Sequence, residues 1–542
     1  MSNRELLSIA TSALRVTQKA LDTTGHNIAN VNTEGYHRQR VDTATRTPLF
    51  TGAGFFGTGV HITDVQRAYD EFLDNRVREA TTRFSETDRF YRLSAQVDNI
   101  TADPDVGLAS AMANFFNAVH DVATDPTSIP ARQTLLSEAG TLTDRFHLLD
   151  SRLRELDAQT QHELQAQIDE INTTATKIAE LNHKIVHEIG KGQGHLPNDL
   201  LDQRDLLVTR LAEKIDVTPV PQDDGSVSLF IGKGHELVGG AHANRLGLKA
   251  NDLDPNQQEI TFDSDSTSLT VTKDLTGGEV GGLLRFREQV LIPTQNKLGR
   301  LAAGIALEFN QLHQSGYDLD GNTGQDFFVA PPIAVMQNGT GTVTATYTGP
   351  SADLQASDYL LEYDGSSYTL TRLSDRFQQT LTTFPATVDG IQIDVTSAPT
   401  GASRFLIRPT AEAAGKIEPN LDDPRRIAAA GSAGAEGDNQ IALSLAALES
   451  DKKLLGGKAT FQDAYGQMVT EVGSLTRAAE ISRGAHETVK RQTLEAHEQL
   501  AGVNLDEEAA NLVKYQQTYQ AAAQVVTIAS QTFDALINAV RR

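Results

Sequence analysis

The stretch LDEEAANLVKYQQTYQAAAQVVTIASQTFDALINAV, residues 505–540, repeats mainly apolar residues at alternating spacings of four and three. This spacing predicts one long helix with a coiled-coil seam. Asp506, Glu507 and Glu508 fall in its first turn, and Arg541 and Arg542 follow its end, so both groups suit the helix dipole. A terminal helix that docks on its own domain would show the same pattern. The seam comprises Leu505, Ala509, Leu512, Gln516, Tyr519, Ala523, Val526, Ser530, Phe533, Ile537 and Val540.

The opposite end of the chain carries a second amphipathic segment, residues 3–31. Its apolar stripe is wide, so more than one partner could cover it. We expect this helix to end within 30–35, where Asn and Gly cluster. The stripe comprises Leu6, Ile9, Ala13, Val16 and Ala20.

Further helical patterns lie between the two ends, and each needs a partner for its apolar face. One run covers 142–156 and continues over 164–189, where glycines follow it. Others cover 298–312 and 461–500. Because these segments are far apart in the chain, an elongated bundle built from both halves is the simplest arrangement.

The middle of the chain is different, with short β-like runs over 216–280 and clearer alternation over 330–410. Asp364-Gly365 between two such runs predicts a hairpin. The predicted fold class is mainly α with a β insertion, in an elongated multi-domain protein. It combines terminal coiled-coil helices with a helical bundle that carries an all-β domain. The predicted domains are a terminal helical assembly domain, 1–60 and 500–542; a helical bundle, 61–215, 281–325 and 411–499; its β-containing excursion, 216–280; and an outer β domain, 330–410.

Charge and composition exclude several classes of protein. The net charge of −24 disfavours a nucleic-acid binder, and the chain has no cysteine for disulfides or thiolate chemistry. Residues 1–40 carry five Lys/Arg and three Asp/Glu, whereas 501–542 carry three and four, so the acidic excess lies in the middle. Near-neutral ends could pack against copies of themselves. Neither a signal peptide nor a membrane-spanning apolar segment is evident.

No residue pattern predicts catalysis. His183 and His187 have the i, i+4 spacing of metal ligands, but a zincin would place Glu where Lys184 stands. Residues 318–326 resemble the front of a calcium loop, although Asp, Asn and Gly also form ordinary turns. We therefore expect no catalytic residues, no metal site and no cofactor.

The segment Asn27-Ile-Ala-Asn-Val-Asn-Thr-Glu-Gly-Tyr36 resembles the N-terminal signature of flagellar rod, hook and hook-associated proteins. Residues 52–60, 316–328, 502–512 and 515–522 resemble the hook-associated family, specifically its members at the hook–filament junction. The motif residues are Ala29, Asn30, Thr33, Gly35 and Tyr36.

This resemblance implies a non-enzymatic structural subunit of the bacterial flagellum that joins hook to filament by self-assembly and supports motility. It implies secretion, unfolded, through the type III export apparatus to the extracellular flagellum. The implied partners are copies of the chain, the hook protein, the next hook-associated protein and an export chaperone on the C-terminal helix. Because a lone molecule could not cover both terminal stripes, we expect the terminal domain to be disordered in the monomer. The expected interface comprises Leu6, Ile9, Val16, Leu512, Tyr519, Val526, Phe533 and Ile537.

Two other interpretations stay open from the sequence. Another flagellar axial protein, such as the hook protein, would form long polymers. An extracellular adhesin or enzyme would carry its activity within 216–410.

Overall fold

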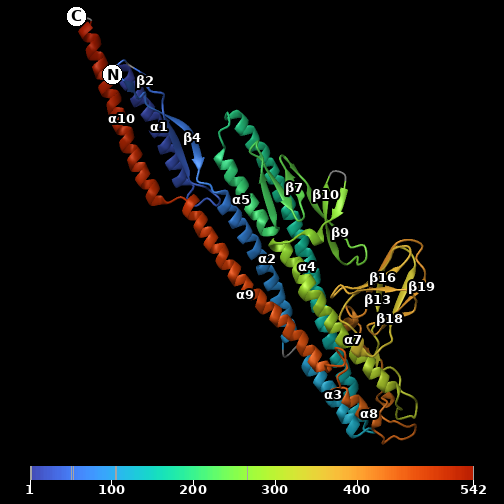
Figure 1. The fold of residues 1–542 in the computed structure, drawn as a ribbon. Coiled ribbons are helices and arrows are strands. Elements are labelled where there is room, and N and C mark those ends of the chain that lie inside the picture. Colours follow the sequence, from blue (N-terminus) through green and yellow to red (C-terminus); the bar gives the residue numbers. More distant parts are fainter. Residues whose placement is uncertain (1–2, 51, 53, 104–106, 265–266, 541–542) are drawn as a thin grey trace.

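The chain forms an elongated molecule whose long helices run along one axis (Figure 1). The computed structural model describes residues 3–50, 52, 54–103, 107–264 and 267–540. The first and last helices, α1 and α10, pack side by side at one end, and the sheets lie along one side of the helical body (Figure 1). The predicted fold class, mainly helical with inserted β structure, is confirmed.

Two helix pairs follow one another along the molecule: α1 packs on α10, and α2 packs on α9 (Figure 1). Both pairs join segments from opposite ends of the chain, as the bundle prediction requires. The helix bounds are α1 Asn3–Ala29, α2 Glu71–Ala102, α3 Leu108–Thr124, α4 Ile129–Lys191, α5 Asn198–Lys214, α6 Gly278–Phe286, α7 Ile292–Gln314, α8 Gln440–Ala447, α9 Phe461–Ala501 and α10 Leu505–Val540.

Local sequence explains where the longest of these helices begin and end. The predicted runs over 142–156 and 164–189 form one helix, α4, of 63 residues and about 95 Å. The Ser128 hydroxyl accepts a hydrogen bond from the Ala131 amide at its start, and Gly192 caps its end. Helix α9 begins with a capping box between Thr460 and Asp463.

The strands form small antiparallel sheets. Their spatial orders are β1-β4, β2-β3, β5-β6-β7-β8, β11-β10-β9, β12-β21, β13-β20-β15-β16-β17 and β14-β19-β18. The bounds are β1 Gln39–Thr45, β2 Leu49–Phe50, β3 Phe55–Phe56, β4 Val60–Arg67, β5 Val217–Pro221, β6 Val227–Ile231, β7 His235–Gly239, β8 His242–Ala243, β9 Arg245–Ala250, β10 Gln258–Ser264, β11 Thr267–Thr270, β12 Phe328–Val329, β13 Ala334–Asn338, β14 Thr342–Tyr347, β15 Tyr359–Tyr363, β16 Tyr368–Arg372, β17 Gln378–Leu381, β18 Ala386–Val388, β19 Ile391–Ser397, β20 Ser403–Arg408 and β21 Glu418–Pro419.

The sheets β13-β20-β15-β16-β17 and β14-β19-β18, both within residues 334–408, share one apolar core that includes Leu361, Ile393 and Phe405. The hairpin predicted at Asp364-Gly365 joins β15 to β16, and Tyr363 pairs with Tyr368. Its loop spans 364–367, longer than the two residues expected, because the Asp364 carboxylate accepts from the amides of residues 366 and 367. The β1-β4 hairpin within 39–67 is not predicted by the sequence.

A buried aromatic cluster packs α3 and α7 against β12 and the residue before it. Phe115, Phe309, Phe327 and Phe328 are buried, with ring centroids 4.6 to 6.3 Å apart. The Asn310 side chain accepts from the amides of Phe327 and Phe328 and donates to the Phe328 carbonyl. The loop over 316–328 therefore ends by inserting its two phenylalanines into the core.

His313, at the end of α7, makes this region sensitive to acid. Its Nε2 accepts from the Ala428 amide at 2.8 Å and its Nδ1 lies against the Gln325 carbonyl, so the folded protein holds the neutral ring. Burial lowers the His313 pKa to about 4, from 6.5. Above about pH 6.5 the ring is neutral whether folded or unfolded. Between about pH 6.5 and pH 4 only the unfolded state gains the proton, so stability falls by on the order of 3 kcal/mol.

We expect the variant His313→Gln to be less stable than the natural protein at neutral pH but to lose less stability on acidification. Urea midpoints at about pH 7 and about pH 4.5 measure the difference. His162→Gln, an exposed position on α4, is the matched control and should follow the natural protein. Parallel pH profiles for the natural protein and His313→Gln would contradict the assignment.

Candidate assembly interface

Small side chains allow the two terminal helices to pack closely. Ala10 and Ala20 of α1 are buried, as are Ala522 and Ala529 of α10. The sequence placed Ala523 in the seam, one position further along the chain. A shift of one residue turns the helix by about 100°, so the buried line differs from the predicted one.

The predicted interface residues fall into two groups. Leu6, Ile9, Val16, Leu512 and Val526 are half-buried. The other three stay exposed on α10: Tyr519 at 39%, Ile537 at 41% and Phe533 at 54%. The structure thus pairs the two helices but does not bring all the predicted residues into the pair.

Further exposed apolar residues accompany these three along α10, and only one of them, Leu505, belongs to the seam that the sequence predicted. They are Leu505, Val513, Val525 and Ile528. Together with Tyr519, Phe533 and Ile537 they make up what we call the open face of α10, meaning the surface of the helix outside its buried line through Ala522 and Ala529, around which these seven residues are spread. Helical residues this apolar are normally covered by another surface.

A second apolar surface lies at the tip of the β1-β4 hairpin, which packs along α1. Leu49, Phe50, Phe55 and Phe56 are exposed there, and the rings of Phe50 and Phe55 lie 5.2 Å apart. We call these four residues the hairpin tip. Gly59 (φ +112°) sits where a side chain would overlap the Ser12 hydroxyl of α1, so the hairpin can lie flat on the helix.

The family motif forms the turn that leads from α1 into this hairpin. The Asn30 side chain donates to the His26 carbonyl and accepts from the Thr33 hydroxyl. Gly35 (φ +77°) reverses the chain, and a Cβ there would lie 2.9 Å from the Leu206 Cβ. Ala29 is exposed in the last turn of α1. The motif therefore has a structural role in the turn.

Tyr36 and Asn27 complete the turn. The Tyr36 hydroxyl donates to the Asn27 carboxamide at 2.8 Å, and Asn27 bonds both the amide and the carbonyl of Gln39, the first residue of β1. Burial raises the Tyr36 pKa above its ordinary value, with smaller contributions from Asp199 and Asp202. The buried Asn27 is a residue whose role the sequence analysis did not identify.

An ion-pair network fixes the base of the hairpin to α5. The Arg67 guanidinium reaches Asp202 at 2.8 Å and Asp205 at 2.7 Å, and it stacks over the Tyr69 ring. His37 contacts the Asp202 carboxylate at 2.8 Å. Burial alone would lower the Arg67 pKa, but Asp205 and Asp202 raise it above its ordinary value. The network therefore keeps its charges and ties the terminal part of the chain to the helical body.

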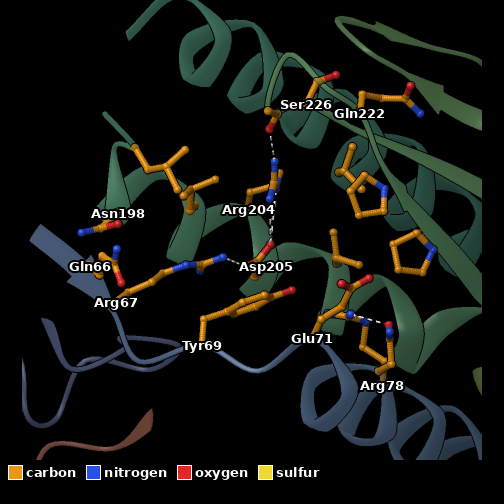
Figure 2. Close-up of a pocket in the computed structure, with 18 of the residues that line it drawn as sticks. Gln66, Arg67, Tyr69, Glu71, Arg78, Asn198, Arg204, Asp205, Gln222 and Ser226 are labelled. Carbon is orange, nitrogen blue, oxygen red and sulfur yellow. Dashed lines mark hydrogen bonds and ion pairs between the residues drawn. The ribbon is translucent and has the colours of Figure 1, made fainter. Parts of the chain in front are cut away.

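A cavity of about 450 Å³ borders this network (Figure 2). Three of its charged groups pair with one another: Arg67 and Arg204 both pair with Asp205, and Arg204 also donates to the Gly225 carbonyl. Figure 2 shows the Arg67 and Arg204 side chains both directed toward Asp205 at the side of the cavity. The arrangement is that of a structural contact between α5 and its neighbours.

Two other sequence hypotheses concern metals. His183 and His187 both lie exposed on α4. In the calcium-like segment, the Asp318 carboxylate accepts from the Asp320 and Asn322 amides, as in an ordinary turn. Asp320 pairs with Arg425. Across the described residues, every helix is too short or too polar to cross a membrane.

Family models match four separate parts of the chain. Residues 94–328 match the flagellar hook-associated protein FlgK helical domain, and residues 334–409 match the D2-like domain of flagellar hook-associated protein 1. The two ends match rod-protein models: residues 7–37 the flagella basal body rod protein, and residues 499–539 the C-terminal model of the flagellar basal body rod FlgEFG proteins. All four models describe flagellar components.

Curated relatives cover nearly the whole chain. Flagellar hook-associated protein 1 of Escherichia coli K12 is 34% identical over 98% of this chain and 99% of its own length. The Salmonella typhimurium protein of the same name is also 34% identical, with the same coverage. The chain belongs to the flagellar hook-associated protein 1 family. This confirms the predicted family and the prediction of a structural subunit of the flagellar hook–filament junction.

A solved structure shares the fold. The flagellar hook junction protein FlgK from Burkholderia pseudomallei superposes with a TM-score of 0.74 at 24% identity. The match covers 79% of this chain and 100% of that one.

Proposed function

We propose that the chain joins hook to filament by self-assembly through its paired terminal helices, with the open face of α10 and the hairpin tip packing against neighbouring subunits. The observation that carries this proposal is the exposure of apolar residues on the terminal part of the chain. Burying such surface stabilises an assembly by about 25 cal/mol per Å². Tyr519, Phe533 and Ile537 would then lie between subunits, in agreement with the sequence hypothesis.

The distribution of charge supports the same orientation. The ends are near neutral, with net charges of +2 over 1–40 and −1 over 501–542, while the whole chain carries −24. Close packing of the ends in a tubular wall would bring little like charge together. The acidic domains would face outward into solvent.

The partners follow from this position. The proposed partners are copies of the chain, the hook protein on one side and the next hook-associated protein on the other, with an export chaperone holding α10 before assembly. The proposed location is the extracellular flagellum at the end of the hook. Membership of a structural flagellar family favours a non-catalytic role.

A complementation experiment tests the proposal. Cells lacking the gene should make hooks without filaments, and the full chain should restore both filaments and motility. A chain that ends at residue 504, and so lacks α10, should not restore them. Immuno-electron microscopy should place the full chain at the hook tip. Filaments that attach normally in the deletion strain would contradict the proposed role.

The state of the isolated molecule is a separate prediction. In the monomer α1 and α10 pack mainly on each other and on the hairpin. The apolar surface that they bury is therefore too small to offset the conformational entropy lost when the two helices become ordered. We expect a protease to remove both ends from dilute monomer well before it cuts the helical body. Mass spectrometry of the fragments locates the cuts. Ends as resistant as α4 would show that the isolated pair is already stable.

A further inference from the structure

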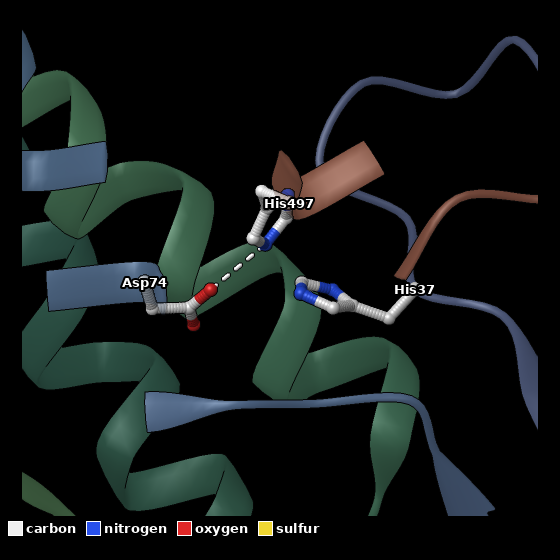
Figure 3. A group of neighbouring side chains, drawn as sticks. All are labelled: His37, Asp74 and His497. Atoms are coloured by element: carbon white, nitrogen blue, oxygen red, sulfur yellow. Dashed lines mark ion pairs between the residues drawn. The ribbon is translucent and has the colours of Figure 1, made fainter. Parts of the chain in front are cut away.

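Three side chains from distant parts of the chain meet where the α1–α10 pair joins the α2–α9 pair (Figure 3). His37 follows α1, Asp74 lies in the first turn of α2, and His497 lies near the end of α9. One ring nitrogen of each histidine and one carboxylate oxygen of Asp74 all lie within 4.8 Å of one another.

His37 offers one free ring nitrogen to this group. Its Nδ1 lies 2.8 Å from the Asp202 carboxylate, which holds a proton on that nitrogen and leaves the lone pair of the neutral ring on Nε2. His37 is only 4% exposed, and its Nε2 has no hydrogen-bond partner among the described side chains and backbone. In Figure 3 a ring nitrogen of His37 faces Asp74 and His497. A carboxylate behind a ligand histidine is the usual outer partner in metal sites.

The other two side chains complete a ligand set. The His497 Nε2 lies 2.8 Å from the Asp74 carboxylate, which is buried. Two imidazole nitrogens and one carboxylate oxygen are typical ligands of Zn²⁺ and related divalent ions, with a further position left for water. Asp202 lies behind His37 and also pairs with Arg67.

We propose that His37, Asp74 and His497 form a binding site for a divalent transition-metal ion of the Zn²⁺ class. The donor atoms must rearrange to share an ion at about 2.0 Å, because the His497 Nε2 and the Asp74 carboxylate, 2.8 Å apart, now pair directly with each other. His497 can make this movement, because its side chain is 23% exposed. All three residues line a groove of about 1250 Å³ between the segments 31–38 and 494–507, and this groove gives an ion access.

A bound ion would link three segments that cross the joint between the two helix pairs. The segment after α1, the start of α2 and the end of α9 would share one set of bonds, in addition to the hydrogen bond from the Arg38 amide to the Ala501 carbonyl. The ion would therefore fix the angle of the terminal pair to the body. This inference does not depend on the proposed junction function.

The test uses the purified full chain with the exposed pair removed by His183→Gln and His187→Gln, because i, i+4 histidines can bind Zn²⁺ themselves. Calorimetric titration with Zn²⁺ should give one equivalent in this background. Adding His497→Gln should weaken binding by at least about tenfold. Adding His162→Gln instead, an exposed position on α4, should change nothing.

Asp74→Asn provides a second variant, and it should weaken Zn²⁺ binding in the same way. Circular dichroism shows whether each variant keeps its helices. Co²⁺ gives an independent signature, since its visible absorption reports nitrogen and oxygen ligands and should disappear in His497→Gln. Zn²⁺ binding that is unchanged in folded His497→Gln, or absent once His183 and His187 are replaced, would overturn the proposal.

Discussion

Phe533→Asp should leave the isolated protein folded but prevent filaments from attaching to hooks. Phe533 is 54% exposed on the open face of α10, so in the monomer the change is a surface substitution worth within about 0.5 kcal/mol. Between subunits the aspartate would be buried without a partner, which costs on the order of several kcal/mol. In the proposed assembly every subunit repeats this contact, so the free-energy cost is added once for each copy.

Phe377→Asp is the matched control for this prediction. Phe377 is 52% exposed between β16 and β17, so the residue exchanged and its exposure are nearly the same. Swimming in soft agar and electron microscopy of hooks measure the outcome, with circular dichroism of both purified variants. Loss of motility with Phe377→Asp as well, or normal filaments with Phe533→Asp, would contradict the proposal that α10 lies in the interface.

The helical part of the fold is predictable because periodicity is a local signal. The helix predicted over 3–31 is α1, Asn3–Ala29, and the segment 505–540 matches α10. Periodicity does not decide which of two adjacent apolar lines faces its own chain. On α10 the line through Ala522 and Ala529 faces inward, while Tyr519 and Phe533 stay exposed. The sequence therefore predicted an interface but not its division between intramolecular and intermolecular contacts.

The hairpin and the joint could not be found in the same way. The β1-β4 strands are only partly buried, so their alternation is weak, and register shifts between Asp42 and Thr43 break it. The joint between the two helix pairs is made by polar residues from distant parts of the chain. His37 and Asp202, for example, are 165 positions apart. No local pattern marks such pairs, because only the fold brings them together.

Gly299→Ala should strongly destabilise the protein through a backbone collision. Gly299 lies on α7 at a point where a Cβ would overlap the carbonyl oxygen of Thr410, in the segment that follows β20. The Thr410 hydroxyl also bonds the Asn296 side chain of α7, so this segment cannot move away without breaking that bond. Overpacking in a core costs about 1–3 kcal/mol, and we expect the upper end or more because a carbonyl cannot rotate aside as a side chain can.

Gly140→Ala separates this collision from the ordinary effect of alanine in a helix. Gly140 lies on α4, where an added Cβ would have no atom within 4 Å apart from the adjoining backbone of its own helix, so the substitution should stabilise the protein by up to about 1 kcal/mol. Both variants gain the same helix propensity, and only Gly299→Ala meets another backbone. Urea unfolding should therefore shift in opposite directions, with new protease cleavage near 409–415 in Gly299→Ala. Equal midpoints would mean that α7 and the segment after β20 are packed less closely than the distance between Gly299 and the Thr410 carbonyl indicates. The sheets within residues 334–408 would then be only loosely attached to the helical body.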